Sequence, residues 1–307
     1  MRIAVFGIGG VGGYYGGRLA SRYPSGSEHE VLFFCRGAHL EAIRANGLRV
    51  QSQDGEFTAS PSLATDSVAE MGLVDVALYC TKGYDLASVA ASTRAALSSN
   101  TVAIPLGNGV NNDEVLKRAL GDAVVLNGCV YISSHIESPG FIQQTGGSRK
   151  LFFGTPGEVE AYRGIESLLQ SAGIDATLTG EILQRVWTKY VFIDASSGVT
   201  SLHGATIGQM LDDDAMRRQF RGLMEEVVAL AVHRGVPLPE DVVSATLKTA
   251  ASFPPATKTS MQLDFEFGRR TELDVMLGYI VRSAIEAGIP TPVHDHVYAA
   301  LAARERA

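Results

Sequence analysis

The sequence predicts an α/β protein whose first part alternates strands and helices and whose last part is entirely helical. Before about Thr177, short β-branched runs alternate with stretches of helical periodicity, and beyond it the strand runs stop. The chain has 307 residues, of which 46% are hydrophobic and 19% charged, so it is long enough for two domains and too apolar to be disordered. We expect the two domains to cover residues 1–178 and 179–307.

The first domain contains six candidate strands, each a short run rich in β-branched or aromatic residues. These runs are Ile3–Phe6, Val31–Cys35, Val74–Cys80, Val102–Pro105, Val124–Asn127 and Leu151–Phe153. Helical periodicity between them covers Val11–Arg22, Ala38–Ala45, Leu86–Leu97 and Asp113–Ala119. Because strands and helices alternate, we expect a parallel sheet with right-handed crossovers.

Two segments of the first domain are expected to be antiparallel. Leu48–Ser52 and Glu56–Ser60 alternate in polarity around Asp54-Gly55, a dipeptide typical of a type I′ hairpin turn. Farther along the chain, Pro139-Gly140 separates two strand-like runs within Val130–Thr145, which indicates a second antiparallel element.

The second domain shows helical periodicity interrupted only by glycines and prolines. The predicted helices are Gly180–Ser201, Ala215–Arg234, Glu240–Ser252, Thr271–Ala287 and Val293–Arg304. Their apolar faces make a homodimer through this domain one open alternative.

Composition excludes several classes of protein. The net charge is −7, from 26 basic and 33 acidic residues, so the basic field of a nucleic-acid-binding protein is missing. No apolar run reaches the roughly 18 residues of a membrane span. Cys35, Cys80 and Cys129 are odd in number and far apart, so we expect reduced thiols rather than disulfides or metal ligands, as in the cytoplasm.

A glycine-rich motif, Gly7-Ile8-Gly9-Gly10-Val11-Gly12, follows the first strand and opens the first helix. In a GxGxxG motif the first glycine permits a tight turn, the second lets the backbone approach a pyrophosphate, and the third allows close packing of helix and strand. The amino end of the helix then offers its N–H groups to the phosphates. The motif in this context predicts a Rossmann-type dinucleotide-binding domain.

The end of the second strand indicates which dinucleotide binds. An NAD site usually places an acidic residue there, to accept the ribose hydroxyls. This sequence has Arg36 instead, and an arginine suits the 2′-phosphate of NADP(H). We therefore expect NADP(H), while a solvated loop arginine is the alternative interpretation of Arg36.

Several further motifs resemble the ketopantoate reductase family (2-dehydropantoate 2-reductases). They run in the family's order from residue 1 to about residue 300: Gly7 to Gly16, Arg36-Gly37-Ala38-His39-Leu40, Thr81-Lys82, Pro105-Leu106-Gly107-Asn108-Gly109-Val110, Lys189, Ser260 and Glu272. Each motif alone is weak, but the set is specific.

The resemblance implies a reductase in which Lys189 is the general acid. Hydride transfer to a 2-keto acid leaves an alkoxide that needs a proton, and a positioned lysine can supply it. Lys189 lies in an apolar segment, whereas a lysine on an amphipathic helix is more often a surface residue. The resemblance implies that Glu272 contacts the substrate, the cofactor or this lysine. The alternative interpretation is an ordinary glutamate in the first turn of a helix, where the helix dipole favours a negative charge.

The remaining site residues also follow from the resemblance. Asn108, Ser260 and Ser197 are the candidate substrate-binding residues, while the glycine motif, Arg36, Lys82, Asn108 and Glu272 are the candidate cofactor-binding residues. The alternative interpretations are a turn residue for Asn108 and a cap or loop residue for Ser260. The alternative for Lys82 is a solvent-facing lysine at the end of a strand. Asp264 matches a recurrent acid that we take as structural.

The sequence departs from the family where asparagines are expected four and eight residues after the lysine. Ile193 and Ser197 occupy these positions, which share a helix face with Lys189. Asp194 is about 100° farther round the helix, so it would replace an amide only if the helix were distorted. A site with fewer amides makes fewer polar demands on its substrate, which favours a bulkier or less polar keto acid as an alternative.

The predicted function is therefore NADPH-dependent reduction of a 2-keto acid, with 2-dehydropantoate (ketopantoate) the first candidate, as in pantothenate biosynthesis. A different 2-keto acid, an opine-type or 3-hydroxyacid dehydrogenase, and a non-catalytic NADP-binding regulator are the alternatives. We expect no metal, because His294 and His296 are two residues apart on a helix and point to different faces.

Overall fold

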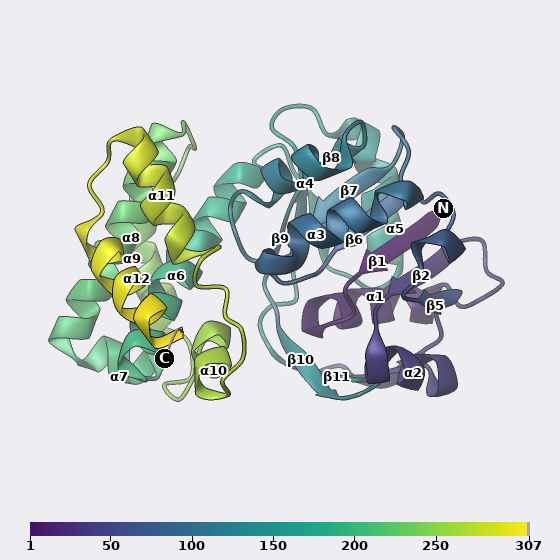
Figure 1. Cartoon of the computed structure of the whole chain (residues 1–307), viewed down its shortest axis with the longest axis horizontal. Helices are drawn as coiled ribbons and strands as arrows, with labels where there is room; N and C mark the ends of the chain where they lie inside the picture. Colours follow the sequence, from purple (N-terminus) through teal and green to yellow (C-terminus); the bar gives the residue numbers. More distant parts are fainter. Residues whose placement is uncertain (306–307) are drawn as a thin grey trace. The chain divides into compact units, whose positions relative to one another are not determined.

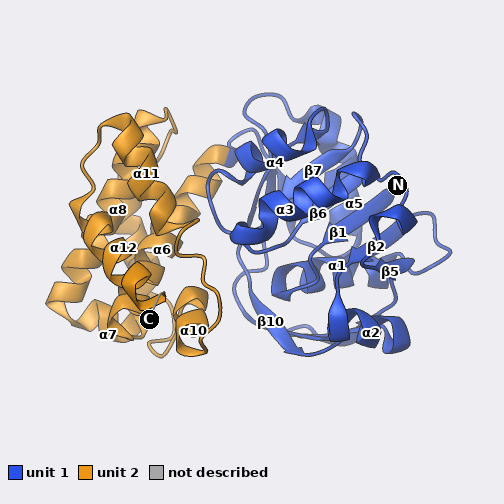
Figure 2. Ribbon diagram, in the orientation of Figure 1, with its two compact units in different colours: residues 1–182 blue, residues 183–307 orange. Residues whose placement is uncertain are grey.

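The computed structural model describes residues 1–305 and divides into two compact units, Met1–Ile182 and Leu183–Ala307 (Figure 2). All strands among the described residues lie in the first unit, and the second is built from helices (Figure 1). This confirms the predicted fold class. None of the described helices is long and apolar enough to cross a membrane.

The centre of the first unit is a six-stranded parallel sheet. Its strands, in spatial order, are β5 (Leu63–Thr65), β2 (Glu30–Phe34), β1 (Arg2–Phe6), β6 (Val76–Tyr79), β7 (Val102–Pro105) and β8 (Val124–Val125). Every pairing in this sheet is parallel. The strand order reverses between β1 and β6, so the carboxyl ends of these two strands flank the crevice where such sheets bind ligands.

Alternate residues of β1 point to opposite faces of this sheet, and both faces are covered. Ile3 and Val5 join the core that contains α1 (Gly10–Arg22) and α5 (Arg163–Ser171). Ala4 and Phe6 join the core under α3 (Gly83–Thr93) and α4 (Asn112–Leu120), which lie over the sheet in Figure 1. Burial on both faces explains why the strands are continuous apolar runs.

A second sheet packs on α1 and contains both predicted antiparallel elements. Its spatial order is β10 (Ser133–Ser138), β11 (Phe141–Gly146), β3 (Leu48–Ser52) and β4 (Gly55–Ala59). The hairpin of β3 and β4 and the hairpin of β10 and β11 are both antiparallel, as predicted. Between them β11 and β3 pair in parallel, a contact between distant segments that periodicity does not reveal.

One strand prediction was wrong in its placement. The run Leu151–Phe153 does not extend the parallel sheet, because β12 (Leu151–Gly154) lies in a separate sheet between β13 (Ala176–Leu178) and β9 (Asn127–Val130). The predicted strand Val124–Asn127 is also divided, into β8 and the start of β9. Strand propensity locates extended segments, but it carries no information on their partners.

The second unit consists of α6 (Ile182–His203), α7 (Ile207–Asp212), α8 (Asp214–His233), α9 (Val242–Ala251), α10 (Ser260–Glu266), α11 (Leu277–Ala287) and α12 (Pro292–Glu305). The carboxylate of Asp213 caps α8, accepting hydrogen bonds from the N–H groups of Ala215 and Met216. The five long helices match the predicted ones, with one correction. Residues 273–276 form turns, so the helix predicted from Thr271 begins only at Leu277.

Candidate active site

The glycine motif forms the connection between β1 and α1. Gly7 has a φ of +94°, a conformation that only glycine adopts readily, and its N–H donates to the Phe34 carbonyl at 3.0 Å. Gly9 is the N-cap residue of α1, and no side chain in the described structure caps this helix. The N–H groups of the first turn, which includes Val11, are therefore available to an anion.

The glycines of this loop face different surroundings. A Cβ atom at Gly12 would lie 2.0 Å from the Gly7 carbonyl oxygen and 2.9 Å from the Cys80 Cβ, which accounts for glycine where helix and strand meet. A Cβ atom at Gly10 would lie 2.1 Å from the Ser134 carbonyl oxygen in β10. At Gly9 nothing among the described residues lies within 4 Å of a Cβ position, so open space adjoins this residue.

Two buried polar atoms beside the loop have no hydrogen-bond partner among residues 1–305: Thr81 Oγ1 and Ser134 Oγ. Thr81 lies against Gly7, and Ser134 lies against Gly10. Buried polar groups are normally paired, so unpaired atoms beside a helix amino end fit a site for the phosphates of a dinucleotide. Motif analysis did not place these side chains in the site, and Ser134 carries no local sequence signal.

Three predicted residues lie at the same edge of the sheet as the loop. Arg36 is the exposed N-cap residue of α2 (Gly37–Asn46), two residues beyond β2. Lys82 is the N-cap residue of α3 after β6, and Asn108 follows β7, where its carbonyl accepts from Asn112 Nδ2 at 3.1 Å. The carboxyl ends of adjacent parallel strands thus bring these residues to the edge where the loop lies.

In the helical unit, Lys189 and Ile193 lie one turn apart on α6 and are both half-buried. Ser197, one turn farther, is buried with 4% of its surface exposed. The hydroxyl of neighbouring Ser196 donates back to the Phe192 carbonyl at 2.7 Å, which is a local helix contact. On this face of α6 the residue one turn after Lys189 is thus the apolar Ile193.

Ser260 is exposed at the first position of α10, directly after the N-cap residue Thr259. The Thr259 hydroxyl accepts from the Gln262 N–H and lies 2.9 Å from the Thr200 hydroxyl of α6. This contact joins the start of α10 to α6. Glu272 is buried, with 3% of its surface exposed. It lies at a bend five residues before α11 begins, so the alternative interpretation of Glu272 as a helix-start residue was wrong.

The two histidines near the end of the chain have unrelated surroundings. His294 is fully buried, with Nδ1 2.6 Å from Glu226 Oε2 and Nε2 2.8 Å from Asp194 Oδ2, while His296 is exposed. These carboxylates raise the pKa of His294 to about 9, against the effect of burial. The described residues contain no group of side chains that would hold a metal ion.

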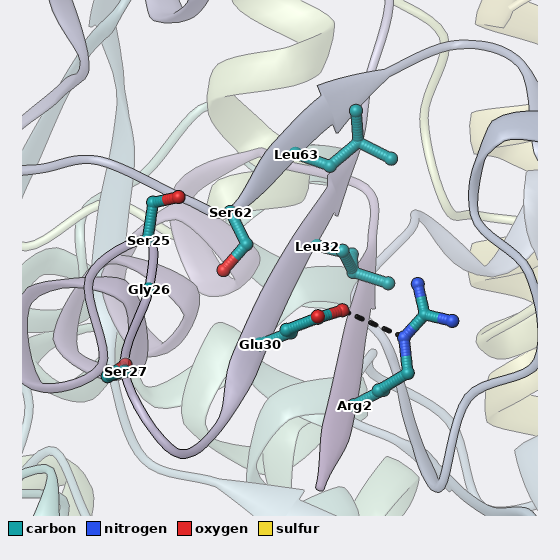
Figure 3. Close-up of a pocket in the computed structure, with 8 residues that line it drawn as sticks. All are labelled: Arg2, Ser25, Gly26, Ser27, Glu30, Leu32, Ser62 and Leu63. Carbon is teal, nitrogen blue, oxygen red and sulfur yellow. Dashed lines mark hydrogen bonds and ion pairs between the residues drawn. The ribbon is translucent and has the colours of Figure 1, made fainter.

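A shallow cavity of about 290 Å³ lies elsewhere in the first unit (Figure 3). Arg2 and Glu30, joined by an ion pair of 2.9 Å, line it together with Ser25, Ser27 and Ser62. These two charged residues begin β1 and β2, so the cavity lies at the amino ends of the strands. The glycine loop lies at the carboxyl ends, and the cavity is therefore not the dinucleotide site.

Comparison with known proteins agrees with this geometry. Residues 3–158 match the family model described as "Ketopantoate reductase PanE/ApbA", and residues 181–305 match the model of its C-terminal part. An uncharacterized oxidoreductase of Bacillus subtilis, YkpB, is 31% identical, with 98% of each chain covered. A 2-dehydropantoate 2-reductase of Mesorhizobium japonicum is 27% identical over 97% of this chain and 96% of its own.

A solved structure shows the same architecture. The crystal structure of 2-dehydropantoate 2-reductase from Porphyromonas gingivalis has a TM-score of 0.85 and 34% identity, covering 98% of this chain and 99% of its own. The matched family models together cover most of the chain, including the glycine loop and Lys189. The chain therefore belongs to the ketopantoate reductase family, whose members are NADP-dependent oxidoreductases that act on a CH–OH group.

Proposed function

We propose that this protein reduces 2-dehydropantoate to pantoate with NADPH, using Lys189 as the proton donor. The observation that carries the proposal is the place of Lys189, half-buried on α6 next to the fully buried Tyr190 and Val191. Most lysine side chains lie in solvent, so a half-buried lysine in an apolar segment is unusual. Ionisable groups in apolar surroundings are candidates for catalysis.

The proposed reaction is balanced by one hydride and one proton. When bound, NADPH would supply the hydride for the new C–H bond at C2, with oxidation of its nicotinamide to balance the reduction. The electron pair of the C=O bond moves to oxygen, and the Lys189 ammonium donates the proton that completes the hydroxyl group. The lysine then regains a proton from solvent.

The other site residues are proposed to bind and orient. Asn108, at the end of β7, would donate its side-chain amide to the substrate or to the nicotinamide ribose. Ser260, exposed at the start of α10, and Ser197 would contact the substrate, and Glu272 would act on Lys189 or the cofactor. On the cofactor side, the glycine loop would hold the pyrophosphate, Arg36 the 2′-phosphate and Lys82 the adjoining part of the dinucleotide.

A second candidate substrate is a 2-keto acid with an apolar side chain. Ile193 favours it, because this half-buried isoleucine lies one helical turn from the proposed proton donor and offers no hydrogen bond. A buried polar group of a substrate would lose its hydration there without compensation.

The test is NADPH oxidation by the purified protein with 2-dehydropantoate and a panel of 2-keto acids. We expect Lys189→Ala to lower kcat by about 10²- to 10⁴-fold, the usual contribution of a general acid, while NADPH still binds. Lys248→Ala, at an exposed position on α9, is the matched control and should have no effect.

Each other outcome has a definite meaning. Turnover of an apolar keto acid alone would replace 2-dehydropantoate by the second candidate. Full activity of Lys189→Ala would remove the proposed proton donor. NADPH binding without any turnover would favour another dehydrogenase substrate or the regulator.

Two further properties belong to the same proposal. None of the three cysteines, all of them in the described part of the chain, forms a disulfide, which suits a reducing compartment such as the cytoplasm. A homodimer through the helical unit is one open alternative for the assembly, and light scattering of the purified protein tests it.

A further inference from the structure

Residues 271–276, the Glu272 segment, are held by hydrogen bonds on both sides of Glu272. On its amino side, the Thr271 hydroxyl accepts from the Leu273 N–H at 3.1 Å and donates to the Glu305 carboxylate of α12. On its carboxyl side, the Glu272 carbonyl accepts from the Met276 N–H at 2.9 Å. The backbone around Glu272 is therefore fixed, although the segment is not part of a helix.

Another hydrogen bond joins the Glu272 segment to α6 beside the proposed proton donor. The hydroxyl of Tyr190, the residue after Lys189, donates to the Met276 carbonyl at 3.0 Å. Met276 thus binds Tyr190 through its carbonyl and Glu272 through its N–H. This one residue connects the backbone that carries Glu272 to the part of α6 that carries Lys189.

Tyr190 is well suited to hold this contact, because both its ring and its hydroxyl are enclosed. The residue is 1% exposed, and Trp187 packs edge-on against its ring, with centroids 6.2 Å apart. Burial raises the pKa of Tyr190 well above its ordinary value, and the charge of Asp194 has the same effect. The phenol therefore keeps its proton and donates it to the Met276 carbonyl, which is itself buried and would be costly to leave without a donor.

Tyr190 lies on a face of α6 that adjoins the face of Lys189 and Ile193. Tyr190 and Asp194 are one helical turn apart, and each follows a residue of the Lys189 face by about 100° round the helix. Asp194 is fully buried, and its Oδ2 lies 2.8 Å from His294 Nε2 of α12. Polar contacts at both positions therefore fix the rotation of α6 about its axis, and with it the direction of the Lys189 face.

We propose that Tyr190 is a positioning residue for the reduction, which holds the Glu272 segment in place relative to Lys189. The inference rests on the proposed function, in which Lys189 donates the proton and Glu272 acts on Lys189 or the cofactor. Misplacing a catalytic group by about 1 Å can lower a rate by as much as about 10²-fold, so a hydrogen bond that fixes this segment affects kcat without touching the substrate.

The test compares Tyr190→Phe with Tyr298→Phe, since each removes one tyrosine hydroxyl bonded to the Glu272 segment. The Tyr298 hydroxyl of α12 donates to Asp274 Oδ1 at 2.8 Å, and Asp274 is also held by an ion pair of 2.7 Å with Arg282. With the keto acid that the unchanged protein reduces, we expect Tyr190→Phe to lower kcat by about two- to tenfold, which corresponds to one lost hydrogen bond. Tyr298→Phe, which leaves the contact with α6 intact, should keep the kcat of the unchanged protein.

A double-mutant cycle separates positioning from stability. Glu272→Gln keeps the volume of the side chain but removes the carboxylate, so its exact position no longer matters and adding Tyr190→Phe should lower kcat little further. A purely structural role of Tyr190 would instead give additive losses. Amide hydrogen exchange of residues 272–277 should also be faster in Tyr190→Phe than in the unchanged protein, because the segment has lost its anchor on α6.

Four results would overturn the inference. They are a normal kcat in Tyr190→Phe, an equal loss in Tyr298→Phe, additive losses in the double variant, and unchanged hydrogen exchange in the Glu272 segment. Failure of the proposed function has a different signature, because the unchanged protein itself would then reduce no keto acid, and the role of Tyr190 in the reaction would fall with it.

Discussion

At the scale of single residues, neighbouring glycines of the dinucleotide loop have different roles that substitution can separate. A methyl group at Gly10 would meet the backbone of Ser134 at 2.1 Å, whereas one at Gly9 would meet nothing within 4 Å among the described residues. We expect Gly10→Ala to lower the free energy of unfolding by roughly 1–3 kcal/mol, the usual effect of overpacking. Gly9→Ala should leave stability unchanged and weaken NADPH binding, because its methyl group occupies the space beside the helix amino end.

Denaturant unfolding and NADPH titration of both variants check this prediction, each variant serving as the control for the other. A stable Gly10→Ala protein, or a Gly9→Ala protein with normal NADPH affinity, would contradict it. The motif alone predicted a pyrophosphate loop, and its geometry fits one. It did not predict the contact of Gly10 with β10, because Ser134 is far along the chain and pairing between distant strands leaves no local pattern.

At the scale of elements, one face of α6 carries the proposed specificity. Lys189 and Ile193 are half-buried one turn apart, and the next position, Ser197, is buried. 2-Dehydropantoate carries a hydroxyl group that an isoleucine cannot hydrogen-bond. We expect Ile193→Asn to raise kcat/KM for 2-dehydropantoate relative to an apolar 2-keto acid by up to about tenfold, since one hydrogen bond contributes roughly 0.5–1.5 kcal/mol.

Specificity constants for the two substrates measure this ratio. Ile285→Asn, at a 73% exposed position on α11, makes the same chemical change away from α6 and should leave the ratio unchanged. An unchanged ratio in Ile193→Asn would mean that this face of α6 does not set the preference.

Elements themselves were predictable where a long pattern specified them. The four central strands of the parallel sheet, the hairpin at Asp54-Gly55 and the long helices of the second unit agree with the sequence prediction, whereas strand β5 and helix α5 were not predicted. The short helices α7 and α10 were not predicted, since six or seven residues give too little periodicity. Residues 273–276 continue the helical periodicity of α11 but form turns, which shows that periodicity does not locate a helix boundary.

At the scale of the whole molecule, the stability of the helical unit depends on a buried ion network. His294 joins Asp194 of α6 to Glu226 of α8, and Glu226 also accepts from the N–H groups of Val293 and His294 at the start of α12. No sequence pattern pairs these residues, because they are brought together only by the packing of three helices. Burying charged groups is costly unless they are paired, and here the His294 ring contacts both carboxylates while two backbone N–H groups donate to Glu226.

This network predicts a loss of stability at alkaline pH. The pKa of His294 is raised from 6.5 to about 9, so its contribution is fully present below pH 6.5 and is lost as the pH rises toward 9. This difference between the two pKa values corresponds to roughly 3 kcal/mol in the free energy of unfolding.

Trp187, the only tryptophan, lies buried in α6, and its fluorescence during denaturant unfolding reports on the helical unit. We expect the free energy of unfolding to fall between pH 6.5 and 9, and His294→Gln to be destabilised and to lack this slope. His296→Gln, at the exposed histidine of the same helix, should keep the slope, and a flat profile in the unchanged protein would mean that the buried histidine is neutral.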